Sequence, residues 1–127
     1  MIVKSPILPK KMRKIPKSFS WIDHRLVSDR HIDQCSHVAA ALYLFLVCVS
    51  DDKGLSYYGD PSIRTKLSMD LRTLQNARSA LIQMGLIAFQ KPLYQVLDLE
   101  PDQKIRQAGS SAMVLGEILK RATEVKP

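Results

Sequence analysis

The stretch that decides the fold is residues 67–87, LSMDLRTLQNARSALIQMGLI. It begins with a polar turn in which the Asp70 carboxylate can cap a following helix and suits the positive end of its dipole. Four apolar residues then follow at spacings of three, four and three: Leu74, Ala77, Leu81 and Met84. That spacing is one apolar stripe at helical period, and Gly85 suits the position just after the helix end. The stretch predicts a turn and an amphipathic helix, and leaves the role of the polar face open.

A shorter helix is predicted immediately before this stretch. Asp60 is expected to be its N-cap, and Pro61 its first residue, where the missing N–H of proline costs nothing. The helix then covers residues 62–67, with Ile63 and Leu67 facing inward. Only a tight turn separates it from the amphipathic helix, so the two form a short helix, a turn and a longer helix.

The segments on either side complete the expected domain. Downstream, LIAFQK and PLYQVLDL (residues 86–99) predict a hairpin that turns at Lys91 and Pro92. Upstream, residues 38–49 are almost wholly apolar behind a possible Ser36 cap, which predicts a central helix covered on several sides. Twelve residues are fewer than the roughly 18 that a membrane span needs, so we expect no membrane. A turn with a positive φ at Gly54 and a short edge strand over 55–58 are expected between this apolar helix and the short helix over 62–67.

The ends of the chain are expected to differ from this middle part. We predict a basic arm over residues 1–18, a folded domain over 19–99, and a linker with a C-terminal amphipathic helix over 100–127. Within 19–35 we expect a helix over 22–30, and apolar residues such as Phe19 and Trp21 that anchor it to the core. A weak homodimer through the helix predicted at 111–123, or through the apolar 36–49 helix, is a hypothesis.

The formal charge of +7 is concentrated in the arm. Residues 1–20 carry six basic side chains and no acidic one, which leaves +1 for the other 107 residues. Block charge together with three prolines predicts an extended segment, and such an arm favours a polyanion, with DNA or RNA as the natural candidates. A tail that only keeps the protein soluble is the equal alternative. The basic residues assigned to the arm are Lys10, Lys11, Arg13, Lys14 and Lys17.

Composition and motifs argue against several other classes of protein. Two cysteines form no disulfide framework, and no secretory leader pattern is present, so we expect a cytoplasmic protein. Phosphate-binding, dinucleotide-binding, zinc-protease and serine-hydrolase motifs are absent, so we expect no enzyme and no cofactor. His31, Cys35 and His37 invite a metal site with Cys48 or His24, but their spacing matches no zinc pattern and we predict none.

A resemblance to a known family adds to this interpretation. LSMDLRTL (residues 67–74) with Ala77, Leu81 and GLI (85–87) resembles the winged helix-turn-helix pattern of bacterial DNA-binding proteins. The nearest versions occur in phage and plasmid replication-organiser proteins and related transcription regulators, and the resemblance covers about residues 36–99. PLYQVL and GEILKR also look like a small group of uncharacterised bacterial proteins, some of them linked to mobile elements.

The resemblance implies a mainly α (α+β) fold, a winged helix-turn-helix with a small β-hairpin wing. The implied function is binding of double-stranded DNA, as a transcription regulator or as a replication or mobile-element accessory protein. A protein-interaction adaptor that never reads bases is the alternative, since winged helices also serve that role. An RNA-binding role ranks third because no aromatic RNA-binding strand and no GxxG loop is visible.

In such a unit the second helix offers its N-terminal face to the major groove. Side chains of the types that read base edges lie there, namely Arg72, Thr73 and Asn76. Side chains suited to phosphate contacts are Arg64, Lys66, Gln75, Arg78 and Lys91. The alternative is that these residues are the solvated face that any surface helix carries. The hairpin turn holds a single charge, so it departs from many wings and is a poor probe of the minor groove.

Overall fold

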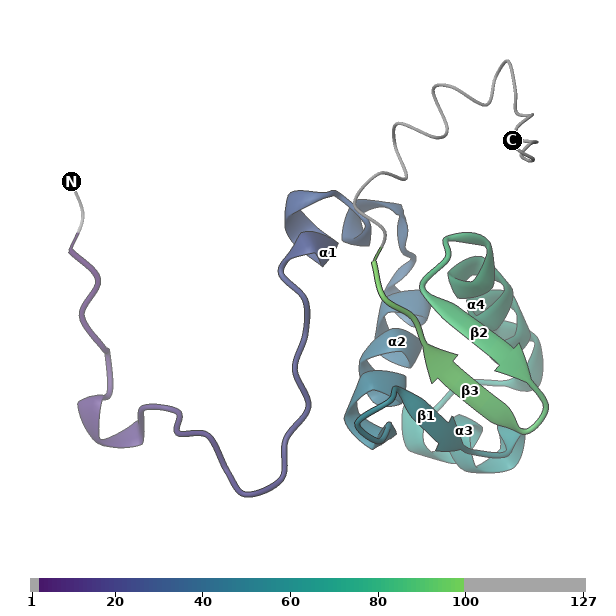
Figure 1. The fold of residues 1–127 in the computed structure, drawn as a ribbon, viewed down its shortest axis with the longest axis horizontal. Coiled ribbons are helices and arrows are strands. Elements are labelled where there is room, and N and C mark those ends of the chain that lie inside the picture. The colour runs from purple at the N-terminus through teal and green to yellow at the C-terminus, as the bar shows by residue number, and fades with distance from the viewer. Residues whose placement is uncertain (1–2, 100–127) are drawn as a thin grey trace, which may run out of the picture. The chain divides into compact units, whose positions relative to one another are not determined.

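The computed structural model of the 127-residue chain describes residues 3–99 (Figure 1). Along the chain these residues form η1 (Pro9–Lys11), α1 (Arg25–Ser28), η2 (Ile32–Gln34), α2 (His37–Val49), β1 (Leu55–Tyr57), α3 (Asp60–Leu67), α4 (Leu71–Gln83), β2 (Ile87–Gln90) and β3 (Leu93–Val96). The predicted α+β class is confirmed. The linker over 100–109 and the helix over 111–123 lie outside the described residues.

Within residues 3–99 the strands form one antiparallel sheet in the order β1-β3-β2 (Figure 1). The predicted hairpin and edge strand are confirmed, with Tyr94 of β3 opposite Ser56 of β1 and Phe89 of β2. Gly54 starts the edge strand with a φ of +84°, and its carbonyl accepts a hydrogen bond from the Val96 amide at 2.8 Å. A Cβ at Gly54 would lie 2.6 Å from the Val96 carbonyl oxygen, so this turn needs glycine.

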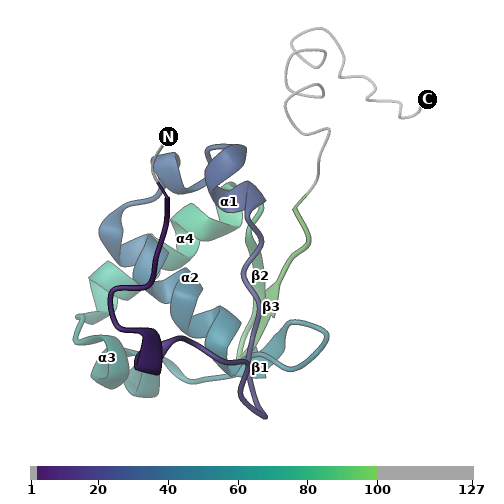
Figure 2. The ribbon, with the colours of Figure 1, turned by 90° about the vertical axis from the view of Figure 1, so that its left-hand side faces the viewer.

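The core lies where α2 and α4 pack together beside the sheet (Figure 2). Leu74, Ala77 and Leu81 are buried as the apolar stripe predicts, and Met84 is half-buried. Fully buried side chains come from both helices, from α3 and from the hairpin: Leu42, Leu46, Ile63, Leu74, Leu81, Leu86, Ile87 and Tyr94. Each of these helices therefore buries one face in the same core and has exposed residues on its other face.

The starts of α2 and α4 and the end of α4 follow the predicted capping residues. The Ser36 hydroxyl accepts a hydrogen bond from the Ala39 amide at 3.0 Å, and the Asp70 carboxylate accepts one from the Thr73 amide at 2.7 Å. At the other end of α4, Gly85 takes a φ of +76°. The amides of Gly85 and Leu86 donate back into the last turn of α4, each at 3.0 Å, so the helix stops there.

The prediction that Asp60 caps α3 is wrong. Gly59 is the N-cap residue, Asp60 is already inside the helix, and Pro61 is its second residue. The Asp60 carboxylate instead accepts a hydrogen bond from Arg78 of α4 at 2.9 Å. Local spacing predicts that this carboxylate caps the helix, but it binds Arg78, which is eighteen positions away in the sequence.

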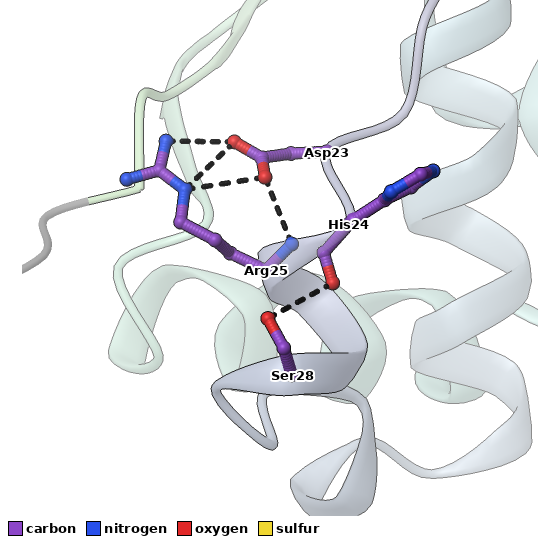
Figure 3. Close-up of polar contacts among 4 residues, drawn as sticks. All are labelled: Asp23, His24, Arg25 and Ser28. Atoms are coloured by element: carbon purple, nitrogen blue, oxygen red, sulfur yellow. Dashed lines mark hydrogen bonds and ion pairs between the residues drawn. The ribbon is translucent and has the colours of Figure 1, made fainter.

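The predicted helix over 22–30 is shorter in the structure, where α1 covers Arg25–Ser28. Asp23 fixes its start, because its carboxylate accepts hydrogen bonds from the Arg25 amide at 2.8 Å and from the Arg25 guanidinium at 2.7 Å (Figure 3). Arg30 follows with a φ of +64°, which no α-helix tolerates. The anchoring role predicted for this segment is fulfilled by Leu26, whereas Phe19 and Trp21 are exposed.

The apolar helix α2 is also less covered than its sequence predicts. Ala39, Leu42, Leu46 and Val47 are buried, but Leu44 and Cys48 on another side are exposed. None of the helices in residues 3–99 has the length and apolar character needed to cross a membrane.

Candidate functional site

The candidate site is built on the connection between α3 and α4. Ser68 ends α3 in the left-handed conformation, with a φ of 53°. The Met69 amide donates to the Arg64 carbonyl at 3.2 Å, which holds the connection against α3. Asp70 then starts α4, so the chain changes direction within three residues. This tight connection fixes the first turn of α4 relative to α3.

Several of the predicted site residues interact with Asp70 at the first turn of α4. Hydrogen bonds from the Thr73 side chain and amide hold the pKa of the Asp70 carboxyl below its ordinary value. The positive charges of Arg64 on α3 and Arg72 on α4 lower the pKa further. Arg64 and Arg72 therefore lie in the electrostatic reach of one carboxylate. Thr73, predicted as a base-reading residue, is already engaged by the cap.

The outward face of α4 is mostly polar, although Leu71 and Ile82 are also exposed. Residues three or four positions apart share a helix face, and the exposed polar residues at that spacing are Arg72, Gln75, Asn76, Ser79 and Gln83. Arg72 and Asn76 stand one turn apart near the N-terminal end. A guanidinium presents a fork of donors, and a carboxamide presents both a donor and an acceptor. Ser79 was not among the predicted site residues, although its position three after Asn76 places it on this face.

Positive side chains flank this face. Lys66 on α3 and Lys91 at the hairpin turn are exposed, as are Arg64 and Arg72. Across residues 3–99 the structure shows no salt bridge from any of these four cations. The acids between them are occupied elsewhere, Asp60 by Arg78 and Asp70 by Thr73. The surface thus keeps its positive charge available for an external anion.

Arg78, predicted as a phosphate contact, is held inside the fold. Its side chain is 12% exposed, and its Nη1 donates to Asp60 at 2.9 Å and to the Tyr94 hydroxyl at 2.8 Å. The guanidinium carbon lies 4.4 Å from the centre of the Phe89 ring, within cation–π range. Burial alone would lower the pKa of Arg78, but the hydrogen bonds to Asp60 and Tyr94 outweigh it and raise the pKa.

These contacts connect three elements through Arg78, because Asp60 begins α3, Arg78 lies in α4, and Phe89 and Tyr94 belong to the hairpin. The sequence held a partial signal for this role. Arg78 comes four residues after Leu74 and one after Ala77, at the border of the buried stripe rather than opposite it. Its partners could not be identified, since they lie sixteen and eighteen positions away.

The thiols and imidazoles behave as separate groups. Within residues 3–99 no three side chains of His, Cys, Asp or Glu are grouped so that they could hold a metal ion. Cys35 is half-buried, with its sulfur 3.9 Å from that of Met84, and burial raises the pKa of its thiol. Cys48 is exposed on α2.

Comparison with known proteins gave no match, whether to a family model, to a curated protein or to a solved structure. The geometry and charge of this chain are therefore the basis for inferring what it binds.

Proposed function

We propose that residues 36–99 form a winged helix-turn-helix that binds double-stranded DNA, with α4 as the helix that enters the major groove. The observation that carries the proposal is the exposed polar face of α4, which starts at a capped N-terminus between unpaired cations. The element order of helix, strand, helix, turn, helix and hairpin supports it, as does the strand order β1-β3-β2. A transcription regulator, or a replication or mobile-element accessory protein, is the cellular role that fits.

The dimensions and chemistry of α4 suit this role. A helix with its side chains is about 10–12 Å wide, and the major groove is about 12 Å wide. Arg72 would donate two hydrogen bonds to the O6 and N7 acceptors of guanine, and Asn76 would pair with N6 and N7 of adenine. Gln75 and Ser79 would contact the groove wall. Thr73 would contribute through the cap and through contact with a thymine methyl.

The flanking cations would position the helix without reading sequence. Arg64 and Lys66 on α3 would contact phosphates on one side of the groove, and Lys91 at the hairpin turn would contact the backbone on the other. Arg78 is left out of the proposed contacts, because its guanidinium is occupied by Asp60, Tyr94 and Phe89. Its proposed part is to hold α3, α4 and the hairpin in the geometry that the contacts require.

The salt dependence of binding to random duplex DNA tests this proposal. The affinity should fall as salt rises, and Lys66→Ala should flatten the slope of log affinity against log salt by about 0.9, the value for one lost phosphate contact. Lys53→Ala is the matched control. Lys53 is also exposed, but its turn adjoins Val96, at the end of β3 away from the hairpin turn. It should leave the slope unchanged.

Fluorescence anisotropy of a labelled duplex gives both slopes. Absence of binding at low salt would contradict DNA binding and favour the adaptor alternative. Equal effects of the two lysine variants would mean that the charge acts diffusely rather than through the α3–α4 surface.

The basic arm forms a second, separable part of the proposal. All side chains of residues 3–20 are exposed, so their charge is available to a polyanion. Deleting residues 1–17 removes Lys10, Lys11, Arg13, Lys14 and Lys17 and should weaken binding to every duplex alike. The same anisotropy titration on two unrelated duplexes measures this. A deletion that altered only the preference between them would contradict it, and one without effect would identify a solubilising tail.

A further inference from the structure

An apolar groove lies beside α2, between this helix, the segment around α1 and the start of the hairpin. It has a volume of about 390 Å³ and is lined mainly by aliphatic side chains. Ile22 and Leu26 come from the segment around α1, Ile32 from η2, Ala40 and Leu44 from α2, and Leu86 from the start of the hairpin. Leu44 is 51% exposed, and Ile22 and Ile32 are exposed to a similar degree. Within the described residues nothing fills the groove.

Two aromatic residues lie just before the groove residue Ile22 in the sequence and are more exposed than the groove residues. Phe19 is 62% exposed, and Trp21, the only tryptophan of the chain, is 73% exposed. Trp21 directly precedes Ile22, which lines the groove. Exposed aromatic side chains next to an apolar groove residue are typical of an interaction site.

We propose that the groove receives Trp21 of a second copy of this chain, so that two copies exchange this side chain in a closed homodimer. The groove and the residue that would fill it belong to one chain, and Trp21 directly precedes the groove residue Ile22 in the sequence. A two-fold arrangement requires that property, because each surface must then be complementary to itself. A tryptophan suits the role, since it is a large apolar anchor and is enriched in the centres of protein interfaces.

The exposed apolar area suffices for an interface of this type. Phe19 and Trp21 together offer about 250 Å², given that an aromatic side chain buries roughly 150–250 Å². Ile22, Val27, Ile32 and Leu44 add about 200 Å² at their exposed fractions. A standard interface takes about 800 Å² from each partner, of which a little over half, about 450 Å², is apolar. These side chains together reach that value if docking buries all of them.

The two ion pairs beside the groove do not oppose such a contact. Asp23 is paired with Arg25 at 2.7 Å, as Figure 3 shows, and Arg30 is paired with Asp33 at 3.0 Å. Hydrogen bonds from the Arg25 side chain and amide hold the pKa of the Asp23 carboxyl low, so this pair stays ionised at neutral pH. Each pair balances its charge within one chain, and docking of the apolar surface leaves both pairs in place.

Sedimentation equilibrium combined with tryptophan fluorescence tests this inference without DNA, so its failure would leave the proposed function standing. The full chain is studied over a concentration series at high salt, where the charges of the two basic arms are screened. We expect a monomer–dimer equilibrium. The emission of Trp21 should shift to shorter wavelength over the same concentrations at which the mass doubles.

Leu44→Glu should weaken the dimer by about tenfold or more, because it places a carboxylate in the apolar groove. Ile82→Glu is the matched control, since Ile82 is 42% exposed on α4 and lies outside the groove. It should leave the equilibrium unchanged. Trp21→Ala provides a second variant, and its high exposure means that the fold does not depend on it. It should also weaken the dimer.

Three results would overturn the inference. The wild-type chain could remain a monomer at every concentration. It could form a dimer while the emission of Trp21 stays that of an exposed indole, which would assign the dimer to another face. The emission could be that of a buried indole even in the monomer, which would mean that the chain fills the groove itself.

Discussion

The helices α2 and α4 have the same length, thirteen residues, and pack against each other, yet their outward faces differ in kind. Each begins with a side chain that accepts a hydrogen bond from the third amide of the helix, Ser36 in α2 and Asp70 in α4. Each buries leucine and alanine in the shared core. Outward, however, α2 presents Leu44 and α4 presents Arg72, Gln75 and Asn76.

This difference separates what builds the fold from what the surface can bind. The inward faces and the caps are alike and explain why both segments are helices in contact. The outward faces are not needed for that purpose, so their composition points to partners. A polar, cation-flanked face suits the base edges and phosphates of DNA, whereas an apolar face suits another protein surface.

The largest effect expected on stability is that of Arg78→Ala, set against Arg72→Ala on the same helix. Loss of Arg78 leaves the buried Tyr94 hydroxyl and the Asp60 carboxylate without their partner. The free energy of unfolding should fall by about 3 kcal/mol. Arg72 is exposed, so Arg72→Ala should change stability by less than about 0.5 kcal/mol. Urea denaturation measures both values.

In DNA binding the two arginines should act differently, because Arg72 is proposed to contact bases and Arg78 to hold the elements that carry the contacts. Arg72→Ala should impair base preference in a protein of normal stability. Arg78→Lys keeps the charge but loses the planar group that lies over Phe89, so it should remain destabilised. If Arg78→Ala were as stable as wild type, the contacts of Arg78 would not be what holds α3, α4 and the hairpin together.

A smaller effect should distinguish the two caps. Ser36→Ala should cost about 1 kcal/mol of stability at every pH, because a hydroxyl does not titrate. Asp70→Ala should lower stability at neutral pH only. The pKa of Asp70 is lower in the folded chain than in the unfolded chain, so its stabilisation is present above the ordinary carboxyl range. It is lost as the pH falls through the folded pKa.

Urea denaturation of both variants and of wild type, from pH 7 to pH 3, tests this difference. The gap between wild type and Asp70→Ala should shrink toward acid, and the gap for Ser36→Ala should stay constant. Parallel curves for both variants would show that the Asp70 cap does not depend on its charge.

Much of the fold could be predicted from the sequence because its signals are local. Ser36, Asp70 and Gly85 each act on residues within a turn or two, and Gly54 takes the positive φ that its own turn requires, so all four have the roles that were predicted. The stripe from Leu74 to Leu81 likewise needs only helical spacing. The cap predicted at Asp60 and the phosphate contact predicted at Arg78 do not match the structure. A contact between α3, α4 and the hairpin decides the positions of both side chains, and no local pattern encodes it.

The surface was harder to predict for the same reason. The apolar composition of α2 predicts burial on several sides, but composition does not state how many neighbours are present to cover it. Phe19 and Trp21 look like core residues in sequence and are exposed in the structure. The polar face of α4 was correctly located by period, and which of its residues bind DNA stays a prediction.

The most direct test of the central claim is the affinity of wild type and Arg72→Ala for a duplex selected by the wild-type protein. If α4 reads the major groove, Arg72→Ala should bind that duplex about 1–3 kcal/mol more weakly and lose preference at one base pair. Binding to random duplex should change far less. Equal affinity of the two proteins for the selected duplex, with preference intact at every position, would contradict the assignment of α4 as the reading helix.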